Sequence, residues 1–292
     1  MMTWLLKLRP ADSLTIVFSS FLLVLTLVYF PSIPSAGYLM LIYSSIILFQ
    51  IVLIYIGRIN PFLAAARDII FPVVSVLVIF DSLGLIVHAV NRHDIDYLLI
   101  RFDYRMFGGY STVLLERFIN PLLTDVLQVA YSTYYFIPIA LGISLKVGGK
   151  RGPFEKSLFL MLFCFYLSYV GYLLFPAVGP RYAMNHLYDR ELDGFLVSRP
   201  IQNTLNLLEG IKRDAFPSGH TAIALTSLFL SYRYDRTLFR WMLVPVILLV
   251  PATVYCRYHY AVDVVAGAIL AVVTLTAGEV YYNLLSGYAR RS

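Results

Sequence analysis

Charged side chains are scarce in this sequence of 292 residues: Asp, Glu, Lys and Arg make up 14% of it, against 59% hydrophobic residues. With a mean hydropathy of +0.74, this composition excludes an ordinary soluble domain and is typical of polytopic membrane proteins. The only cysteines, Cys164 and Cys256, lie far apart in the chain, so neither a zinc cluster nor a disulfide framework is expected. No proline-rich, serine-rich or charged linker divides the chain, which predicts a single integral-membrane domain over residues 1–292.

Long apolar stretches recur along the whole chain. A membrane-spanning helix requires about 20 mostly apolar residues, and this criterion places helices at 13–30, 38–57, 69–90, 122–146, 157–175, 219–232, 239–256 and 259–285. We therefore expect an all-α, polytopic membrane helical bundle of about eight transmembrane helices. The first span resembles a secretory signal peptide, but its length and the span that follows at once favour an uncleaved helix.

Basic residues are distributed unevenly between the two sides of this predicted bundle. With the N-terminus inside, the inner segments contain Lys7, Arg9, Arg58, Arg67, Lys146, Lys150, Arg151, Lys156, Arg233, Arg236, Arg240, Arg290 and Arg291. Because cytoplasmic loops are enriched in Lys and Arg, both termini are predicted to be cytoplasmic. The net charge of +6 is then explained by topology and anionic lipid, with no nucleic-acid partner. The absence of any Asn-x-Ser/Thr sequon, with compact loops, favours a bacterial inner (plasma) membrane.

Two histidines mark the candidate site. His220 opens the sixth predicted span, and the chain returns through the seventh span to His259, so both histidines face the same, non-cytoplasmic side. Asp263 follows His259 by four residues, which in a helix places the two side chains on one face. A carboxylate there accepts the imidazole N–H and leaves the other nitrogen free to attack.

The residues before His220 predict a phosphate site. In the run PSGH, Ser218 is a good N-cap and Gly219 allows an anion to approach the backbone at a helix N-terminus. Two outer arginines, Arg257 and Arg181, offer planar pairs of donors for phosphate oxygens.

With these motifs the chain resembles the type 2 phosphatidic acid phosphatase superfamily, and HYAVDVVAG is similar to its inositol phosphorylceramide synthase (inositolphosphotransferase) branch. The resemblance implies a six-helix catalytic core, here residues 69–285, preceded by two extra helices in 1–60. Two departures affect the arginines: Arg257 precedes the histidine by two positions rather than six, and GPRY around Arg181 replaces the family's first motif without its lysine.

The resemblance also implies a metal-independent phosphoryl transfer without a cofactor. His259 attacks the phosphorus of a phospholipid or lipid phosphate to form a phosphohistidine, Asp263 orients it, and His220 protonates the leaving oxygen. Water as acceptor makes the protein a lipid phosphatase, and an alcohol makes it a headgroup transferase. The alternative is a non-catalytic lipid transporter or scramblase, which the ionisable residues Asp81 and Glu279 inside the predicted spans favour.

Further residues are candidates for the pocket around the histidines. Tyr258 and Tyr260 flank the presumed nucleophile, and His88 lies near the outer end of its predicted helix. The segment 91–121 mixes apolar and charged residues and is too polar to span, so we expect it to lie in the interface and to roof the site.

Overall fold

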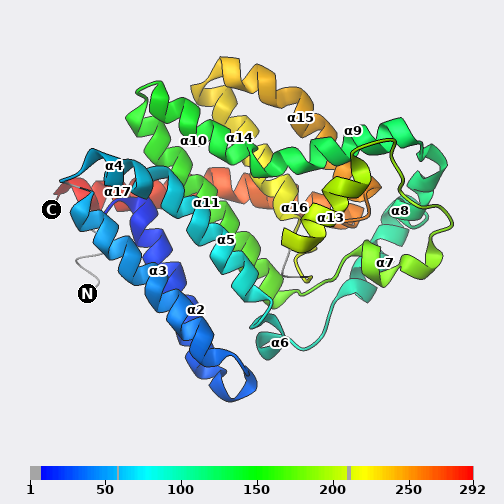
Figure 1. The fold of residues 1–292 in the computed structure, drawn as a ribbon, viewed down its shortest axis with the longest axis horizontal. Coiled ribbons are helices and arrows are strands. Elements are labelled where there is room, and N and C mark those ends of the chain that lie inside the picture. Colours follow the sequence, from blue (N-terminus) through cyan, green and yellow to red (C-terminus); the bar gives the residue numbers. More distant parts are fainter. Residues whose placement is uncertain (1–7, 58, 209–211, 292) are drawn as a thin grey trace.

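The computed structural model describes residues 8–57, 59–208 and 212–291, and within these ranges every regular element is a helix (Figure 1). Lys7 and Arg58, which were assigned to the inner side, lie outside the described residues, as do the side chains of Arg290 and Arg291. The N-terminal helices α2 (Pro10–Val28) and α3 (Ala36–Ile56), joined through η1 (Phe30–Ser32), form a hairpin on one flank. The predicted pair of extra N-terminal helices is therefore present.

The described residues contain six helices that are long and apolar enough to cross a membrane. They are Pro10–Val28, Ala36–Ile56, Phe62–Leu83, Arg151–Leu174, Arg236–Tyr255 and Ala261–Tyr288. A seventh is obtained if the pair Pro121–Tyr135 and Ile137–Val147, bent by 50°, counts as one span. The helix α14 (Gly219–Tyr234) has 16 residues and is too short for this criterion, so the expected number of eight is not confirmed.

The third span differs from its predicted limits of 69–90. It consists of α4 (Pro61–Ala65), the π-helical turn η2 (Ala66–Ile70) and α5 (Phe71–Leu83). The start is fixed by Asn60, whose side chain accepts hydrogen bonds from the backbone N–H groups of Phe62 and Leu63, followed by Pro61 at the first helical position. Asp81 consequently lies exposed in the last turn of α5, near the end of the span.

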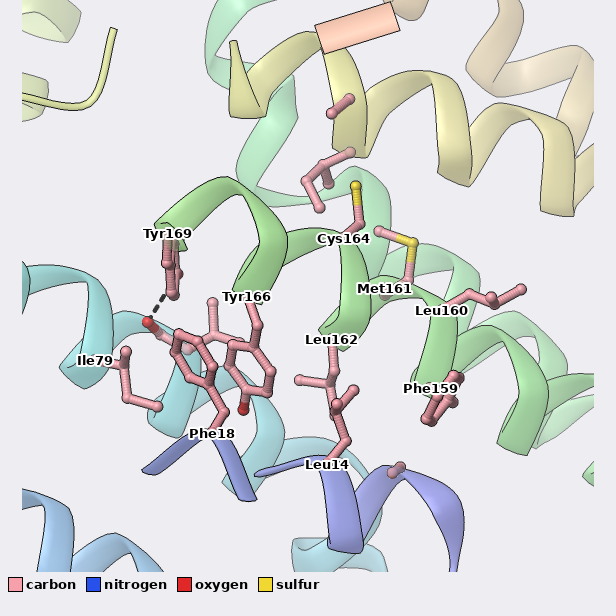
Figure 2. Packing of buried hydrophobic residues seen from close by; sticks show 14 of the residues in the cluster. Leu14, Phe18, Ile79, Phe159, Leu160, Met161, Leu162, Cys164, Tyr166 and Tyr169 are labelled. Atoms are coloured by element: carbon pink, nitrogen blue, oxygen red, sulfur yellow. Dashed lines mark hydrogen bonds between the residues drawn. The ribbon is translucent and has the colours of Figure 1, made fainter. Parts of the chain in front are cut away.

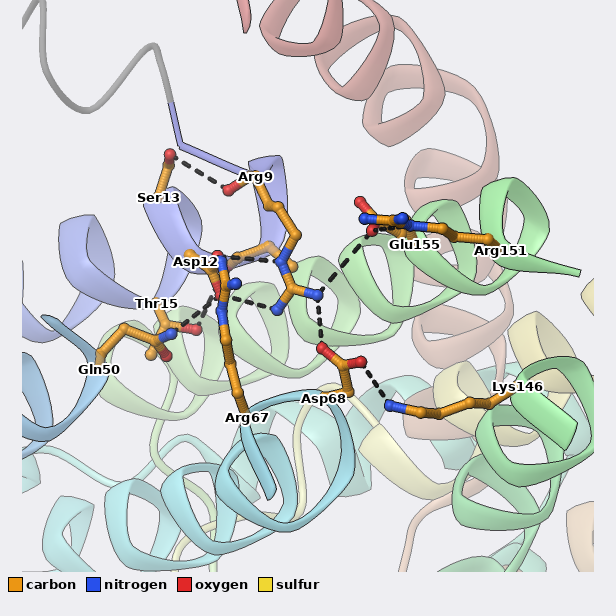
Figure 3. A network of polar contacts seen from close by, with 11 residues as sticks. Arg9, Asp12, Ser13, Thr15, Gln50, Arg67, Asp68, Lys146, Arg151 and Glu155 are labelled. Atoms are coloured by element: carbon orange, nitrogen blue, oxygen red, sulfur yellow. Dashed lines mark hydrogen bonds and ion pairs between the residues drawn. The ribbon is translucent and has the colours of Figure 1, made fainter. Parts of the chain in front are cut away.

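A polar network allows charged residues to lie inside this span (Figure 3). Asp12 of α2 accepts hydrogen bonds from Arg9, from Gln50 and from Arg67, and Asp68 is paired with Arg9 and Lys146. Because each charge has an opposite partner, the cost of withdrawing it from water is offset. The network ties the N-terminal hairpin to the rest of the bundle.

The helix α11 (Arg151–Leu174) forms the centre of the apolar core, with α2 and α5 packed against it (Figure 2). Phe18 stacks on Tyr166 with ring centroids 4.3 Å apart, and the Tyr169 hydroxyl donates to the Val76 carbonyl at 3.0 Å. Dense packing of this kind holds helices together where lipid provides no hydrophobic driving force between them. The remaining helices are α9 (Pro121–Ser132), η4 (Thr133–Tyr135), α10 (Ile137–Val147), α15 (Arg236–Tyr255), α16 (Ala261–Val273), the π-helical turn η6 (Thr274–Gly278) and α17 (Glu279–Arg291).

Glu279 does not lie unpaired within the membrane. Its carboxylate contacts Lys156 at 2.9 Å and Arg233 at 2.5 Å. Arg233 belongs to the last turn of α14, so Glu279 joins the basic end of the bundle, opposite the end at which α14 begins.

Short helices cover the other end. They are α6 (Val87–Val90), α7 (Asp96–Phe107), α8 (Ser111–Leu114), η3 (Leu115–Phe118), α12 (Pro180–Ala183), η5 (Asn185–Leu187) and α13 (Ser198–Leu208). With 12 residues α7 is far too short to span. It exposes Tyr97, Phe102 and Phe107 and buries Asp96 and Asp103, and the interfacial position of segment 91–121 stays a prediction.

Candidate functional site

The two histidines lie in direct contact at one end of the bundle. His220 occupies the first turn of α14, and His259 lies in the turn between α15 and α16. His220 Nδ1 is 3.2 Å from His259 Nε2, and the two residues are 7% and 2% exposed. The structure therefore brings together the two imidazoles that the sequence analysis placed on one side.

The second nitrogen of His259 has two neighbours. Its Nδ1–H donates to the Ala215 carbonyl at 2.7 Å, and the nearest carboxylate oxygen of Asp263 is 3.5 Å away. His259 precedes α16, so the expectation that both residues share a helix face is wrong, although a turn brings them close. The Asp263 carboxylate also accepts a hydrogen bond at 2.8 Å from the N–H of Tyr260, the residue that precedes α16. The proton on Nδ1 leaves the lone pair of Nε2 directed toward His220.

Acidic neighbours set the charge state of His259. Burial alone would lower the pKa of its imidazole, but Asp263, Asp214 and the Ala215 carbonyl together raise that pKa above its ordinary value. Burial also raises the pKa of Asp214 to about 6, against the opposing effect of His259. The site thus contains a second carboxylate, Asp214, that no motif indicated.

The PSGH residues are held by packing as well as by capping. The Ser218 hydroxyl accepts from the Thr221 N–H at 3.3 Å as the N-cap of α14, and the Ser218 N–H donates to the Asp263 carbonyl at 3.1 Å. A Cβ on Gly219 would lie 2.3 Å from the Tyr172 hydroxyl oxygen. Glycine is therefore required at 219 by this close contact, and phosphate binding by Ser218 and Gly219 remains a prediction.

Aromatic rings enclose His220. Tyr131 stacks on it with centroids 4.5 Å apart, and Tyr134 lies at 4.2 Å. Tyr258 in turn stacks on Tyr131 at 4.1 Å. Tyr131 is only 1% exposed and lies between the rings of His220 and Tyr258, and the pocket role of Tyr258 stays a prediction.

The outer arginines lie beyond this aromatic layer. Arg257 contacts Glu116 at 2.6 Å and the Arg190 carbonyl at 2.7 Å, and it stacks on Tyr188 at 3.7 Å. Arg181 donates its backbone N–H to the Arg257 carbonyl at 2.9 Å, and its guanidinium lies 5.6 Å from the Tyr258 ring centroid. The assignment of Arg257 and Arg181 to phosphate binding stays a prediction.

Two buried carboxylates of α7 hold the loops that carry the site. Asp96 accepts from the N–H groups of Val178 and Gly179 and from the Tyr260 hydroxyl, all at 2.8 to 3.0 Å. Asp103 accepts from the N–H groups of Ala261 and Val262 at the start of α16. Tyr260 therefore anchors α7 through Asp96, and its place in a pocket at the histidines stays a prediction.

His88 lies outside the cluster of histidines. It is 48% exposed, and its Nε2 is 3.3 Å from the Asp94 carboxylate. Asp94 in turn pairs with Arg213 at 2.8 Å. The predicted helix 69–90 ends at Leu83, so His88 belongs to the separate short helix α6.

An apolar cavity of about 250 Å³ reaches the site. Its walls come from α5, η4, α10 and α11, it begins near Asp68, and it ends at Asp214 and His220. Phe80, Tyr134 and Phe165 belong to its lining. A cavity with apolar walls and ionisable groups at its ends suits an amphiphilic ligand.

Several important residues were not identified from the sequence. Asp96, Asp103 and Glu116 looked like ordinary interfacial charges, and Ala215 acts through its backbone, which gives no signal in a sequence. Tyr131 follows Gln128 by three residues, and this helical spacing alone could have placed both on the face toward Tyr258, whose hydroxyl accepts from Gln128 at 3.0 Å.

Comparison with known proteins agrees with this geometry. The family model of the PAP2 superfamily matches residues 98–277, more than half of the chain. A PA-phosphatase related-family protein of Dictyostelium discoideum is 28% identical over 197 residues, which cover 60% of this chain and 36% of the relative. The chain thus matches little more than a third of that relative's length, and no solved structure matches it significantly. The match over the segment that contains both histidines shows that this chain belongs to the PAP2 superfamily.

Proposed function

We propose that this protein is an integral-membrane lipid phosphohydrolase or phosphotransferase that acts through a phosphohistidine. The observation that carries the proposal is the 3.2 Å contact between His220 Nδ1 and His259 Nε2, with Nδ1 of His259 hydrogen-bonded to Ala215. One imidazole is thereby fixed with a lone pair aimed at the other. Such a pair supplies a nucleophile and an acid at the same place.

The reaction proceeds in two steps. The phosphoryl group enters between the two rings, which separate to admit it, and His259 Nε2 forms a bond to phosphorus while His220 gives a proton to the leaving oxygen. An acceptor oxygen then attacks phosphorus, the bond to Nε2 breaks, and the acceptor proton passes to His220. Asp263 and Ala215 stabilise the charge that develops on His259.

The apolar cavity supports a lipid substrate. Its polar end contains His220 and Asp214, so a hydrocarbon chain in the cavity presents an attached phosphate to the histidines. Water as acceptor gives a phosphatase, and an alcohol gives the headgroup transfer typical of the inositol phosphorylceramide synthase branch.

The orientation also belongs to the proposal. Eight spans with both termini in the cytoplasm place the site at the periplasmic or extracellular face, in a bacterial inner membrane. Arg9, Lys146, Lys156 and Arg233 gather at the end of the bundle opposite the histidines, which supports this topology. Since Glu279 is paired there, it no longer favours a transporter.

A phosphate-release and headgroup-exchange assay on the detergent-solubilised protein tests the function. We expect His259→Ala to lose all turnover while still inserting and folding, with the exposed His93→Ala as matched control. Turnover retained by His259→Ala would contradict the phosphohistidine. The same assay with phosphatidic acid, with and without alcohol acceptors, separates hydrolysis from transfer.

A further inference from the structure

A second cavity lies on the outer side of the site, beyond the aromatic layer. It has a volume of about 470 Å³ and is bounded by the segment 181–193, the start of α13 and the turn at Cys256 and Arg257. It shares no lining residue with the apolar cavity. We name it the outer pocket.

Arg257 forms the closed side of the outer pocket. The residue is 8% exposed, its backbone adopts a φ of 64°, and its guanidinium is held between Glu116 and the Tyr188 ring. Among the described residues its Nε is buried without a hydrogen-bond partner. A buried donor without a partner is costly, and a ligand oxygen in the outer pocket would satisfy it.

The other lining groups define the chemistry of the ligand. Asn185, Gln202 and Asn203 contribute amides, which donate and accept, while Glu191 and Asp193 contribute carboxylates, which only accept. A hydrocarbon would leave the amides unpaired, while the carboxylates already have a counter-charge, since Arg199 lies 2.8 Å from Asp193 and 3.8 Å from Glu191. Neutral hydroxyl groups can donate to the carboxylates and accept from the amides and arginine.

The outer pocket is separated from the nucleophile by one layer of rings. Arg257 precedes His259 by two residues, and Tyr258 between them stacks on Tyr131, which stacks on His220. To reach the phosphoryl group, a ligand in the outer pocket would have to extend one hydroxyl past these rings. Resting on the proposed function, we propose that the outer pocket binds a polyhydroxylated group, a polyol or sugar.

This group comes from one of two sources. If it is the acceptor, its hydroxyl oxygen bonds to phosphorus as the bond to His259 Nε2 breaks, its proton passes to His220, and a polyol phosphate is released. If it is the headgroup of the donor lipid, it remains on phosphorus in the first step while the lipid alcohol leaves with the proton from His220. The chemistry that the outer pocket recognises is the same.

The experiment compares wild type with the double variant Gln202→Ala/Asn203→Ala, and with Asn283→Ala, an exposed amide on α17, as matched control. One arm measures polyol phosphate formed from phosphatidic acid in the presence of glycerol or sorbitol. The other arm measures cleavage of phosphatidylglycerol relative to phosphatidic acid. Phosphate release from phosphatidic acid without polyol is measured alongside.

We expect the double variant to lose about tenfold in one of the two arms, which is the scale of one or two lost hydrogen bonds, with phosphate release unchanged. Loss in the first arm assigns the pocket to the acceptor, and loss in the second assigns it to the donor headgroup. Wild type that releases phosphate but neither forms polyol phosphate nor cleaves phosphatidylglycerol, or a double variant that matches wild type in both arms, overturns the outer-pocket proposal alone. No phosphate release by wild type overturns the proposed function instead.

Discussion

Gly267 allows α16 to approach the PSGH residues closely enough for the histidines to meet. A Cβ at this position would lie 2.4 Å from the Ser218 carbonyl oxygen, 3.0 Å from the Thr221 Cβ and 3.2 Å from the Ser218 Cβ. The first of these atoms is backbone, so no flexible side chain can move aside. Gly267→Ala therefore requires α16 and the start of α14 to separate.

The size of that separation follows from ordinary contact distances. Relieving a 2.4 Å contact to a van der Waals distance needs a movement of about 1 Å, which overpacked cores accommodate at about 1–3 kcal/mol. His220 lies on α14, and His259 directly precedes α16, so the same movement opens their 3.2 Å contact. A displacement of about 1 Å between catalytic groups costs about 10²-fold in rate.

The assay is phosphate release from phosphatidic acid per folded protein, with thermal unfolding measured in parallel. Gly287→Ala is the control, because a Cβ there meets nothing within 4 Å and alanine is a better helix former than glycine. We expect Gly267→Ala to remain folded and to lose about a hundredfold in kcat, and Gly287→Ala to match wild type. Wild-type turnover by folded Gly267→Ala would refute the link between this helix contact and the histidine geometry.

Three further predictions concern charges around the site. His259 must be neutral to attack, and its pKa is raised, so kcat/KM should fall as the pH drops through a value above the ordinary 6.5 of histidine. Asp214→Asn removes a negative charge near His259, and a pH–rate profile should then show this fall at lower pH. Asp103→Ala leaves two N–H groups of α16 unpaired and should lower stability to denaturant by about 1–3 kcal/mol, whereas Asp103→Asn, which keeps an acceptor oxygen, should cost less. Glu116→Gln leaves the buried guanidinium of Arg257 without its counter-charge and should cost about 3 kcal/mol; unchanged thermal unfolding would show that the pair does not stabilise the fold.

The sequence predicted the helical class and most spans, because apolar runs of membrane length have few alternative structures. The prediction of the span limits failed where charged residues are neutralised by residues far away in the chain. Arg67 and Asp68 were read as an inner loop, yet they lie within the third span because Asp12, Arg9 and Lys146 balance them. Glu279 was read as an intramembrane charge for the same reason, since its partners are far away in the chain.

In the candidate site, too, some positions were predictable from the sequence and others were not. His220 and His259 were brought together correctly, because the argument needed only the direction in which the chain crosses the membrane. The partner of the His259 Nδ1–H was not predictable, since the Ala215 carbonyl is a backbone group without a sequence signature. His88 was misplaced because a helix end at Leu83 and not at residue 90 changes where a side chain lies.

The two cavities and the histidine pair form one consistent arrangement. The apolar cavity ends at His220, the outer pocket is closed by Arg257, and Tyr131 and Tyr258 stack between them. Under the proposed function, a phospholipid would place its hydrocarbon chain in the apolar cavity and its hydroxyl groups in the outer pocket. The atom that joins these two halves in a phospholipid is phosphorus, so this placement would bring the phosphate to the pair of imidazoles.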